Sequence, residues 1–244
     1  MTMFLAGLAM GVVFALLGAG GGIIAVPVLL VLFHAPLTEA TAGALAVVWA
    51  ASVTGAFSHA RGARVSWRTA VLVGLPSMAG AVLGAKAHAL VPERLTLVLF
   101  AAVLLVATAL MFRARSEAHG EPRLEVALLV PVGLALGALT GFLGVGGGFL
   151  IVPALVTLTR LPLKLAIGTS MAIIAGSSLT GALTYVVEGA APMDLVLPMG
   201  AGAVVGALLG APLAGKLPER PLKVGFAVLA LAVATGMGVK ALGA

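Results

Sequence analysis

The sequence predicts an all-α polytopic membrane protein whose chain is a tandem repeat of four apolar segments. Of its 244 residues, 61% are hydrophobic and 9% are charged, whereas a soluble domain carries roughly 25% charged residues. Several apolar stretches reach the ~18 residues that indicate a transmembrane helix. A single offset of 126 positions aligns the two halves without a gap. These observations leave no room for a separate soluble domain.

The repeat is carried by matching motifs along both halves. Ser52-Val53-Thr54-Gly55 matches Ser178-Leu179-Thr180-Gly181, and Pro92-Glu93-Arg94 matches Pro218-Glu219-Arg220. Agreement at one offset indicates a duplication, and internal repeats are a common plan for secondary transporters. The chain therefore divides into a first transmembrane repeat, 1–112, a charged linker, 113–125, and a second transmembrane repeat, 126–244.

Each half is expected to hold four apolar segments joined by short polar turns. The first segment of each half is the longest and the other three have the length of a single span. The eight segments, in order, are Met1–Phe33, Glu39–Ser58, Thr69–Leu90, Leu95–Phe112, Val126–Thr159, Leu165–Val187, Met193–Ala214 and Leu222–Leu242.

A glycine-rich motif, G-x-G-G-G-x-x-x-V-P, interrupts the first segment of each half. It runs from Gly18 to Pro27 and again from Gly144 to Pro153. Glycine is a poor helix former and adopts positive φ readily, so four glycines in five residues are expected to break the helix. A break at membrane depth is tolerated only where it is buried in protein or faces a water-filled cavity. The doubled motif is therefore the first candidate for the working site.

The charges of the loops favour a re-entrant course for each broken segment. If the broken segment crosses the membrane, each side of the membrane carries seven Lys and Arg residues. If it enters and leaves by the same face, one side carries eleven and the other three. The positive-inside rule prefers the second arrangement, in which the two halves are inverted and each has three full transmembrane helices. It places the 113–125 linker in the cytoplasm and both termini outside.

The lengths of the pieces agree with two re-entrant helical hairpins. Thr2–Leu17 has 16 residues and Ile23–Phe33 has 11, and both are shorter than the ~20 residues of a full span. We therefore expect half-membrane hairpins from opposite faces, with glycine tips that meet near the midplane. Thr2–Leu17 is the weak point, because it nearly spans if the bilayer thins.

The glycine tips are candidates for binding an anion. Consecutive glycines let backbone N–H groups converge, and a half-helix beginning near Ile23 or Phe149 offers its positive end. The alternative is that the glycines only allow close packing of helices. The candidate residues in and after the tips are Gly20, Gly21, Gly22, Pro27, Gly146, Gly147, Gly148 and Pro153.

Hydroxyl side chains in the second segment of each half form a second candidate set. Hydroxyls bind oxyanions, but in helices they often donate only to their own backbone, and the sequence leaves both roles open. Other residues are weaker candidates: His59, which matches Tyr185, is a candidate proton relay. The G-x-x-x-G pairs are assigned to helix packing alone. The hydroxyl candidates are Ser52, Thr54, Ser178 and Thr180, and the packing glycines are Gly80, Gly84, Gly206 and Gly210.

Several classes of function are disfavoured by what the sequence lacks. No segment centre carries Asp, Glu, Lys or Arg, which argues against a cation pathway. There is no cysteine, and no metal-ligand cluster, nucleotide-binding loop or catalytic triad. We therefore expect no enzyme activity and no cofactor. The net charge of +6 lies in loops, where the positive-inside rule explains it, so no nucleic-acid partner is expected.

The doubled glycine motif, the Ser-x-Thr-Gly that follows and the eight apolar segments resemble the TauE/SafE (TSUP) family of sulfite exporters. The resemblance covers essentially the whole chain and implies a secondary transporter of small sulfur-containing anions, such as sulfite or organosulfonates, in a bacterial inner membrane. A passive anion channel and a carrier of other small organic anions stay open as alternatives. The expected partners are the anion and the lipid bilayer; proton or sodium coupling and a homo-oligomer are open.

Overall fold

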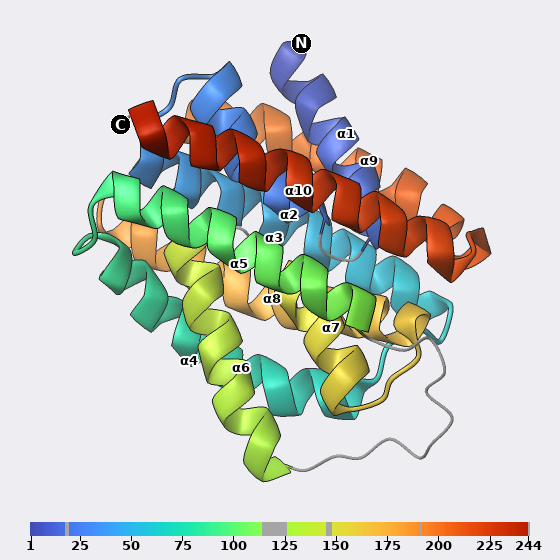
Figure 1. Ribbon diagram of the computed structural model, residues 1–244. Helices are drawn as coiled ribbons and strands as arrows, with labels where there is room; N and C mark the ends of the chain where they lie inside the picture. The colour runs from blue at the N-terminus through green and yellow to red at the C-terminus, as the bar shows by residue number, and fades with distance from the viewer. Residues whose placement is uncertain (18–19, 114–125, 145–147, 191, 244) are drawn as a thin grey trace.

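Every regular element in the described residues of the computed structural model is a helix (Figure 1). The described residues are 1–17, 20–113, 126–144, 148–190 and 192–243. The helices are α1 (Thr2–Leu17), α2 (Gly20–Pro27), the π-helix η1 (Val28–Leu32), α3 (Leu37–Arg61), α4 (Trp67–His88), α5 (Glu93–Arg113), α6 (Val126–Leu143), α7 (Gly148–Leu158), α8 (Leu163–Val187), α9 (Met193–Lys216) and α10 (Glu219–Gly243).

Six of the described helices are long and apolar enough to cross a membrane, three in each half. They are α3, α4 and α5 in the first half and α8, α9 and α10 in the second. This agrees with the predicted all-α membrane fold. Their apolar composition all round suits helices that contact both lipid and one another.

The return helix of the first half begins within the glycine run, and that of the second half begins close to the predicted residue. We expected half-helices from about Ile23 and Phe149; α2 begins at Gly20, and α7 begins at Gly148, next to Phe149. The first four N–H groups of a helix have no acceptor within it, so the first turn makes less demand on helix propensity than the interior. Residues 18–19 and 145–147 lie outside the described residues, as does the predicted linker 113–125 apart from Arg113, which ends α5.

The first arms α1 and α6 approach opposite ends of α3, and α1 has the predicted bounds, Thr2–Leu17. The carbonyl of Ala15, near the end of α1, lies 3.4 Å from Nε2 of His59 in the last turn of α3. Gly144, at the end of α6, lies against Thr41, near the start of α3. Thr41 and His59 are about 27 Å apart along α3, close to the ~30 Å of a hydrocarbon core. Helices α1 and α6 have 16 and 18 residues, both short of the ~20 residues of a full span on which the hairpin prediction rests.

The two halves interleave through glycine contacts. Helix α1 lies along α9 and α6 lies along α4. A Cβ added at Gly7 would overlap the carbonyl oxygen of Met199, and one added at Gly137 would overlap that of Ser77. Such close approach replaces side-chain packing with backbone contact, as small residues allow in membranes. The packing role predicted for the G-x-x-x-G glycines is confirmed, because their added Cβ atoms would meet backbone of the facing helix; they are Gly80, Gly84, Gly206 and Gly210.

Helices α3 and α8 form the centre of the molecule and run antiparallel to each other. Gly55 of α3 faces Met171 of α8, while Leu45 of α3 faces Gly181 of α8. Residue numbers therefore increase along α3 in the direction in which they decrease along α8. Each also packs against a helix of the opposite half, α3 on α9 and α8 on α4. Helices α5 and α10 contact each other and run side by side across the face seen in Figure 1.

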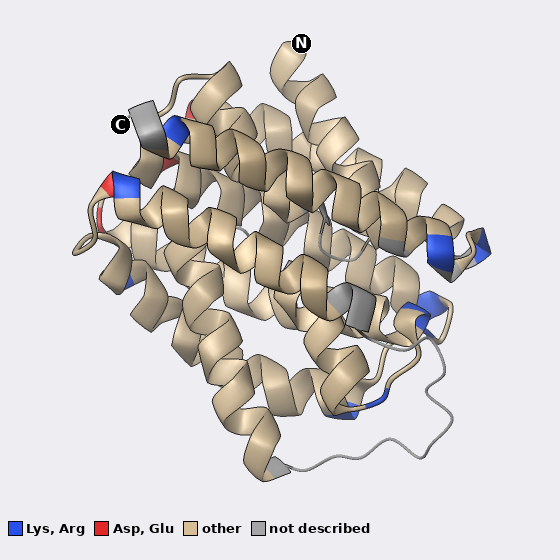
Figure 2. Cartoon of the chain, in the orientation of Figure 1, with Lys and Arg blue, Asp and Glu red and all other residues tan. Residues whose placement is uncertain are grey.

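Charged residues lie at the two ends of the helix assembly (Figure 2). Most of the described Lys and Arg residues gather at one end, where the α3–α4, α7–α8 and α9–α10 turns lie, whereas Lys86, Arg94 and Lys240 lie at the other. We call this the basic end. The Asp and Glu side chains that the structure describes lie at the other end, at starts or ends of helices: Glu39, Glu93, Glu188 and Asp194.

Candidate functional site

The predicted glycines lie where helix amides are free. Gly20, Gly21 and Gly22 form the first turn of α2, and Gly22 is buried. N–H groups of a first turn have no acceptor within the helix and stand at its positive end. Gly148 is the first residue of α7, whereas Gly146 and Gly147 lie outside the described residues.

The two prolines of the motif fall inside the return arms, with different consequences. Pro27 ends α2 and the π-helix η1 follows it directly, so that Phe33 N–H donates to the carbonyl of Val28 at 3.3 Å. Pro153 is buried inside α7, which stays α-helical. Proline has no N–H, so the carbonyl of Ile23, four residues before Pro27, lacks its usual helical donor. Single π turns often accompany functional sites.

The start of α2 lies level with the middle of α3. Leu29 of η1 faces Gly43 of α3, whose added Cβ would stand 3.3 Å from Leu29 Cδ1. Gly20 precedes Leu29 by nine residues, a rise of about 13 Å. Only residues 33–36 join η1 to α3, and α2 and η1 both pack on α3, so the chain reverses direction there and the same rise along α3 from Gly43 reaches Ser52. The glycine run and the Ser-x-Thr-Gly motif of the first half therefore share one depth.

The four predicted hydroxyls have different partners. Ser52 is buried and donates to the carbonyl of Trp49 at 2.9 Å, and Thr54 donates to that of Ala50 at 2.9 Å. Both bonds stay within α3. Thr180 reaches across to α4 and donates to the carbonyl of Met78 at 3.0 Å. Ser178 is fully buried and its hydroxyl has no partner in the part of the chain that is described.

A second buried hydroxyl without a described partner belongs to Ser77 of α4, and the sequence did not point to it. Ser77 of α4 precedes Ala81 by one turn, as Ser178 of α8 precedes Gly181. A Cβ on Gly181 would stand 3.8 Å from the Cβ of Ala81, and contacts along α4 and α8 show that they run parallel. Both hydroxyls therefore flank the same contact. The residue equivalent to Ser77 in the other half is Ala203. A comparison of the two halves therefore does not identify Ser77 as a candidate.

Two equivalent side chains tie the long arms to the central helices. Tyr185 of α8 donates its hydroxyl to the carbonyl of Gly141 at 3.1 Å, and His59 of α3 lies 3.4 Å from the carbonyl of Ala15. The pairs are related by the offset of 126. The last four carbonyls of a helix have no N–H donor within the helix. The side chains of Tyr185 and His59 approach two of these carbonyls. The sequence revealed that His59 matches Tyr185, but not the carbonyl that each contacts.

Metal chemistry has no support among the described residues, which contain no group of three His, Asp or Glu side chains able to hold a metal ion. The central region instead combines free helix amides with buried hydroxyls. Both are donors to anions, and neither requires a buried charge.

Comparison with known proteins decides the family. The profile of the family described as "Sulfite exporter TauE/SafE" matches residues 3–237. This chain belongs to the TauE/SafE family. It is 33% identical over 232 residues to a probable membrane transporter protein of Xylella fastidiosa (strain 9a5c), covering 92% of this chain and 89% of that one. It is 26% identical over 220 residues to the probable membrane transporter protein YdhB of Bacillus subtilis (strain 168), with 88% and 90% covered.

This TauE/SafE protein is thus a membrane transporter, and these two relatives match it over nearly their whole length. The names of these relatives give no substrate. No solved structure matches the chain. The doubled glycine motif and all six candidate spans lie within the matched region or overlap it.

Proposed function

We propose that this TauE/SafE protein is a secondary transporter that carries small sulfur-containing anions, such as sulfite or organosulfonates, by alternating access. The substrate would sit where the starts of α2 and α7 approach the middle of α3 and α8. The hydroxyl of Ser178, which is buried and has no partner among the described residues, is the observation that carries this proposal. A buried hydroxyl without a partner is costly in hydrocarbon, and a bound anion would supply its acceptor.

An anion suits the chemistry of this region better than a cation does. The amides of Gly20, Gly21 and Gly22 are donors at the positive end of α2. The described Asp and Glu side chains lie at one end of the helices and not at their middle (Figure 2). A cation path would need acidic groups or carbonyl rings within the membrane. Amides and hydroxyls without buried carboxylates favour an oxyanion.

We further propose that the halves are inverted repeats, each with a re-entrant hairpin. The antiparallel course of the equivalent helices α3 and α8 supports this, as do the equivalent contacts of α1 on α9 and α6 on α4. The basic end would face the cytoplasm of a bacterial cell, following the positive-inside rule. Opposed repeats of this kind give alternating access by rocking around one central site.

The test compares two serines that occupy the same place in the repeat. Ser178→Ala should weaken binding of sulfite or a short sulfonate about 10- to 100-fold, since hydrogen bonds to charged groups contribute about 1.5–3 kcal/mol. Ser52→Ala is the matched control, because its hydroxyl already donates to the carbonyl of Trp49. Binding is measured on the purified protein with sulfite, thiosulfate, sulfate and short sulfonates, and exchange is measured as counterflow in proteoliposomes.

The outcomes separate the parts of the proposal. Equal loss in both variants, or no loss in Ser178→Ala, would remove Ser178 from the site. Binding of none of the sulfur anions would contradict the substrate class. Uptake without counterflow would contradict the transporter mechanism and favour a passive channel.

A further inference from the structure

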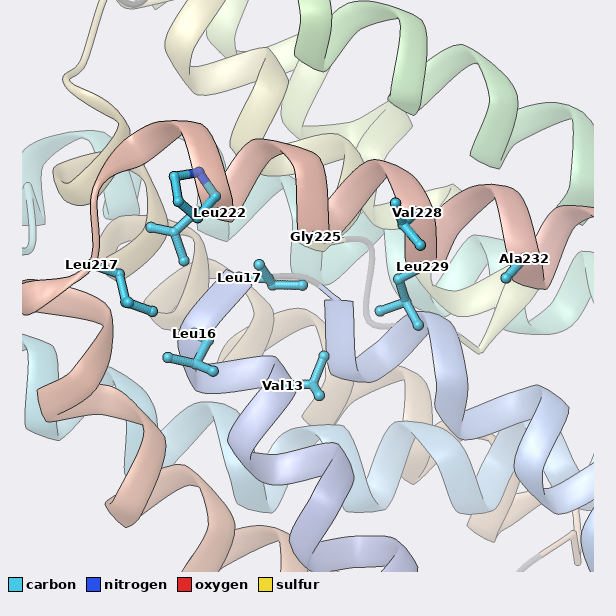
Figure 3. A pocket seen from close by; sticks show the side chains of 10 residues that line it. Val13, Leu16, Leu17, Leu217, Leu222, Gly225, Val228, Leu229 and Ala232 are labelled. Atoms are coloured by element: carbon cyan, nitrogen blue, oxygen red, sulfur yellow. The ribbon is translucent and has the colours of Figure 1, made fainter.

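An apolar groove lies between the end of α1 and the first half of α10 (Figure 3). It encloses about 570 Å³. Leu16 and Leu17 of α1 form one wall, and Leu222, Gly225 and Leu229 of α10 form the other. All of its lining residues are apolar or glycine. Such a groove on a membrane protein suits a hydrocarbon chain.

The groove has the length of one leaflet. Its lining on α10 extends from Pro221 to Ala232, a rise of about 16 Å. Half of a hydrocarbon core of ~30 Å is about 15 Å. The groove therefore runs from the basic end of the molecule to about the middle of the membrane, which is the reach of one acyl chain.

Basic side chains stand at the mouth of the groove. Leu217 and Pro221 line it, and their neighbours Lys216 and Arg220 are exposed. Neither forms an ion pair within the described part of the chain. The turn Lys216–Lys223 carries three basic residues against one acidic residue. A lipid chain lying in the groove would hold its phosphate beside this positive turn.

We propose that this groove is a binding site for an anionic phospholipid of the leaflet at the basic end. The acyl chain lies between α1 and α10, and the phosphate and anionic headgroup lie on Lys216 and Arg220. Lipid tails are as apolar as the groove, so any phospholipid can fill it; the charges select the headgroup. The chain would contact Leu16 and Leu17, the last residues before the first glycine turn, and so brace the hairpin against α10.

The first test places a larger side chain in the groove at a glycine of α10. Gly225→Leu should be accommodated, because an added Cβ meets only Leu17 Cδ2, at 3.9 Å. Gly236→Leu is the matched control on the same helix, where an added Cβ has nothing within 4 Å. Native mass spectrometry of the full-length protein measures the retained phosphatidylglycerol and phosphatidylcholine of identical chains. Wild type and Gly236→Leu should retain phosphatidylglycerol in preference to phosphatidylcholine. Gly225→Leu should retain at most about one fifth of the phosphatidylglycerol that the wild type retains.

The headgroup is tested separately with charge variants. The double variant Lys216→Gln/Arg220→Gln should lower the preference for phosphatidylglycerol over phosphatidylcholine about tenfold or more. Lys86→Gln/Arg94→Gln, which neutralises two exposed basic residues at the other end, should leave it unchanged. Equal retention of both lipids by wild type overturns the proposal. So does retention by Gly225→Leu at the wild-type level, or an equal loss in Gly236→Leu.

Discussion

At the scale of single residues, the hydrogen bonds of Tyr185 and His59 explain how a broken helix is held in place. Both side chains approach a carbonyl in the last turn of a long arm, that of Gly141 in α6 and that of Ala15 in α1. The glycine motifs follow both arms, and α1 ends at Leu17 and α6 at Leu143. Each contact therefore lies in the last turn of its arm and fixes that end against a central helix.

Tyr185→Phe should lower the stability of the protein by about 1 kcal/mol. The change removes one hydrogen bond of ordinary net strength and leaves the buried carbonyl of Gly141 without that donor. The ring contact with His88, at 5.7 Å between centroids, is retained. Thr235→Val is the control, since Thr235 is exposed and donates only to its own helix. Thermal unfolding in detergent measures both, and equal midpoints would contradict the assigned role.

The sequence could predict which hydroxyls are candidates, but not which of them have a hydrogen-bond partner. Ser52 and Ser178 occupy identical motifs, yet one donates to its own helix and the other has no described partner. That difference depends on the rotamer and on which helix faces each serine. Neither is encoded in the spacing of residues along one helix.

At the scale of helices, the decisive feature is that each long arm packs on a helix of the opposite half. The existence of the spans follows from about 20 apolar residues in a row, and this part was predictable. The partner of each span was not, because helices that are apolar all round have no single face that marks a contact. The glycine spacing indicated close packing, and only the fold shows that α6 meets α4 and α1 meets α9.

Gly137→Ala should destabilise the protein by about 2 kcal/mol. The added methyl group would overlap the carbonyl oxygen of Ser77, so α6 and α4 must separate, and overpacking of this kind costs about 1–3 kcal/mol. Gly236→Ala on α10 adds the same group where nothing lies within 4 Å. It should stabilise its helix by up to ~1 kcal/mol through propensity. Opposite shifts of the thermal midpoint are expected, and a gain in both variants would contradict the interleaved packing.

At the scale of the whole molecule, the ends of the helices differ in charge. The α3–α4, α7–α8 and α9–α10 turns, which hold most of the described Lys and Arg residues, lie opposite the described Asp and Glu side chains (Figure 2). The loop charges of the sequence predicted such a division, because they favoured an odd number of crossings in each half. The fold places the α3–α4, α7–α8 and α9–α10 turns together at the basic end, which is where that topology requires them.

Labelling of single cysteines tests which end faces the cytoplasm. The natural chain has no cysteine, so each variant carries one reactive thiol and needs no background removal. Pro218→Cys places it in the exposed α9–α10 turn at the basic end, and Leu90→Cys in the exposed α4–α5 turn at the other end. An impermeant maleimide added to intact cells should label Leu90→Cys at once and Pro218→Cys only after permeabilisation. The two thiols differ in their side of the membrane while sharing exposure and a turn setting, so the comparison isolates orientation. Labelling of Pro218→Cys in intact cells would place the basic end outside and contradict the positive-inside argument.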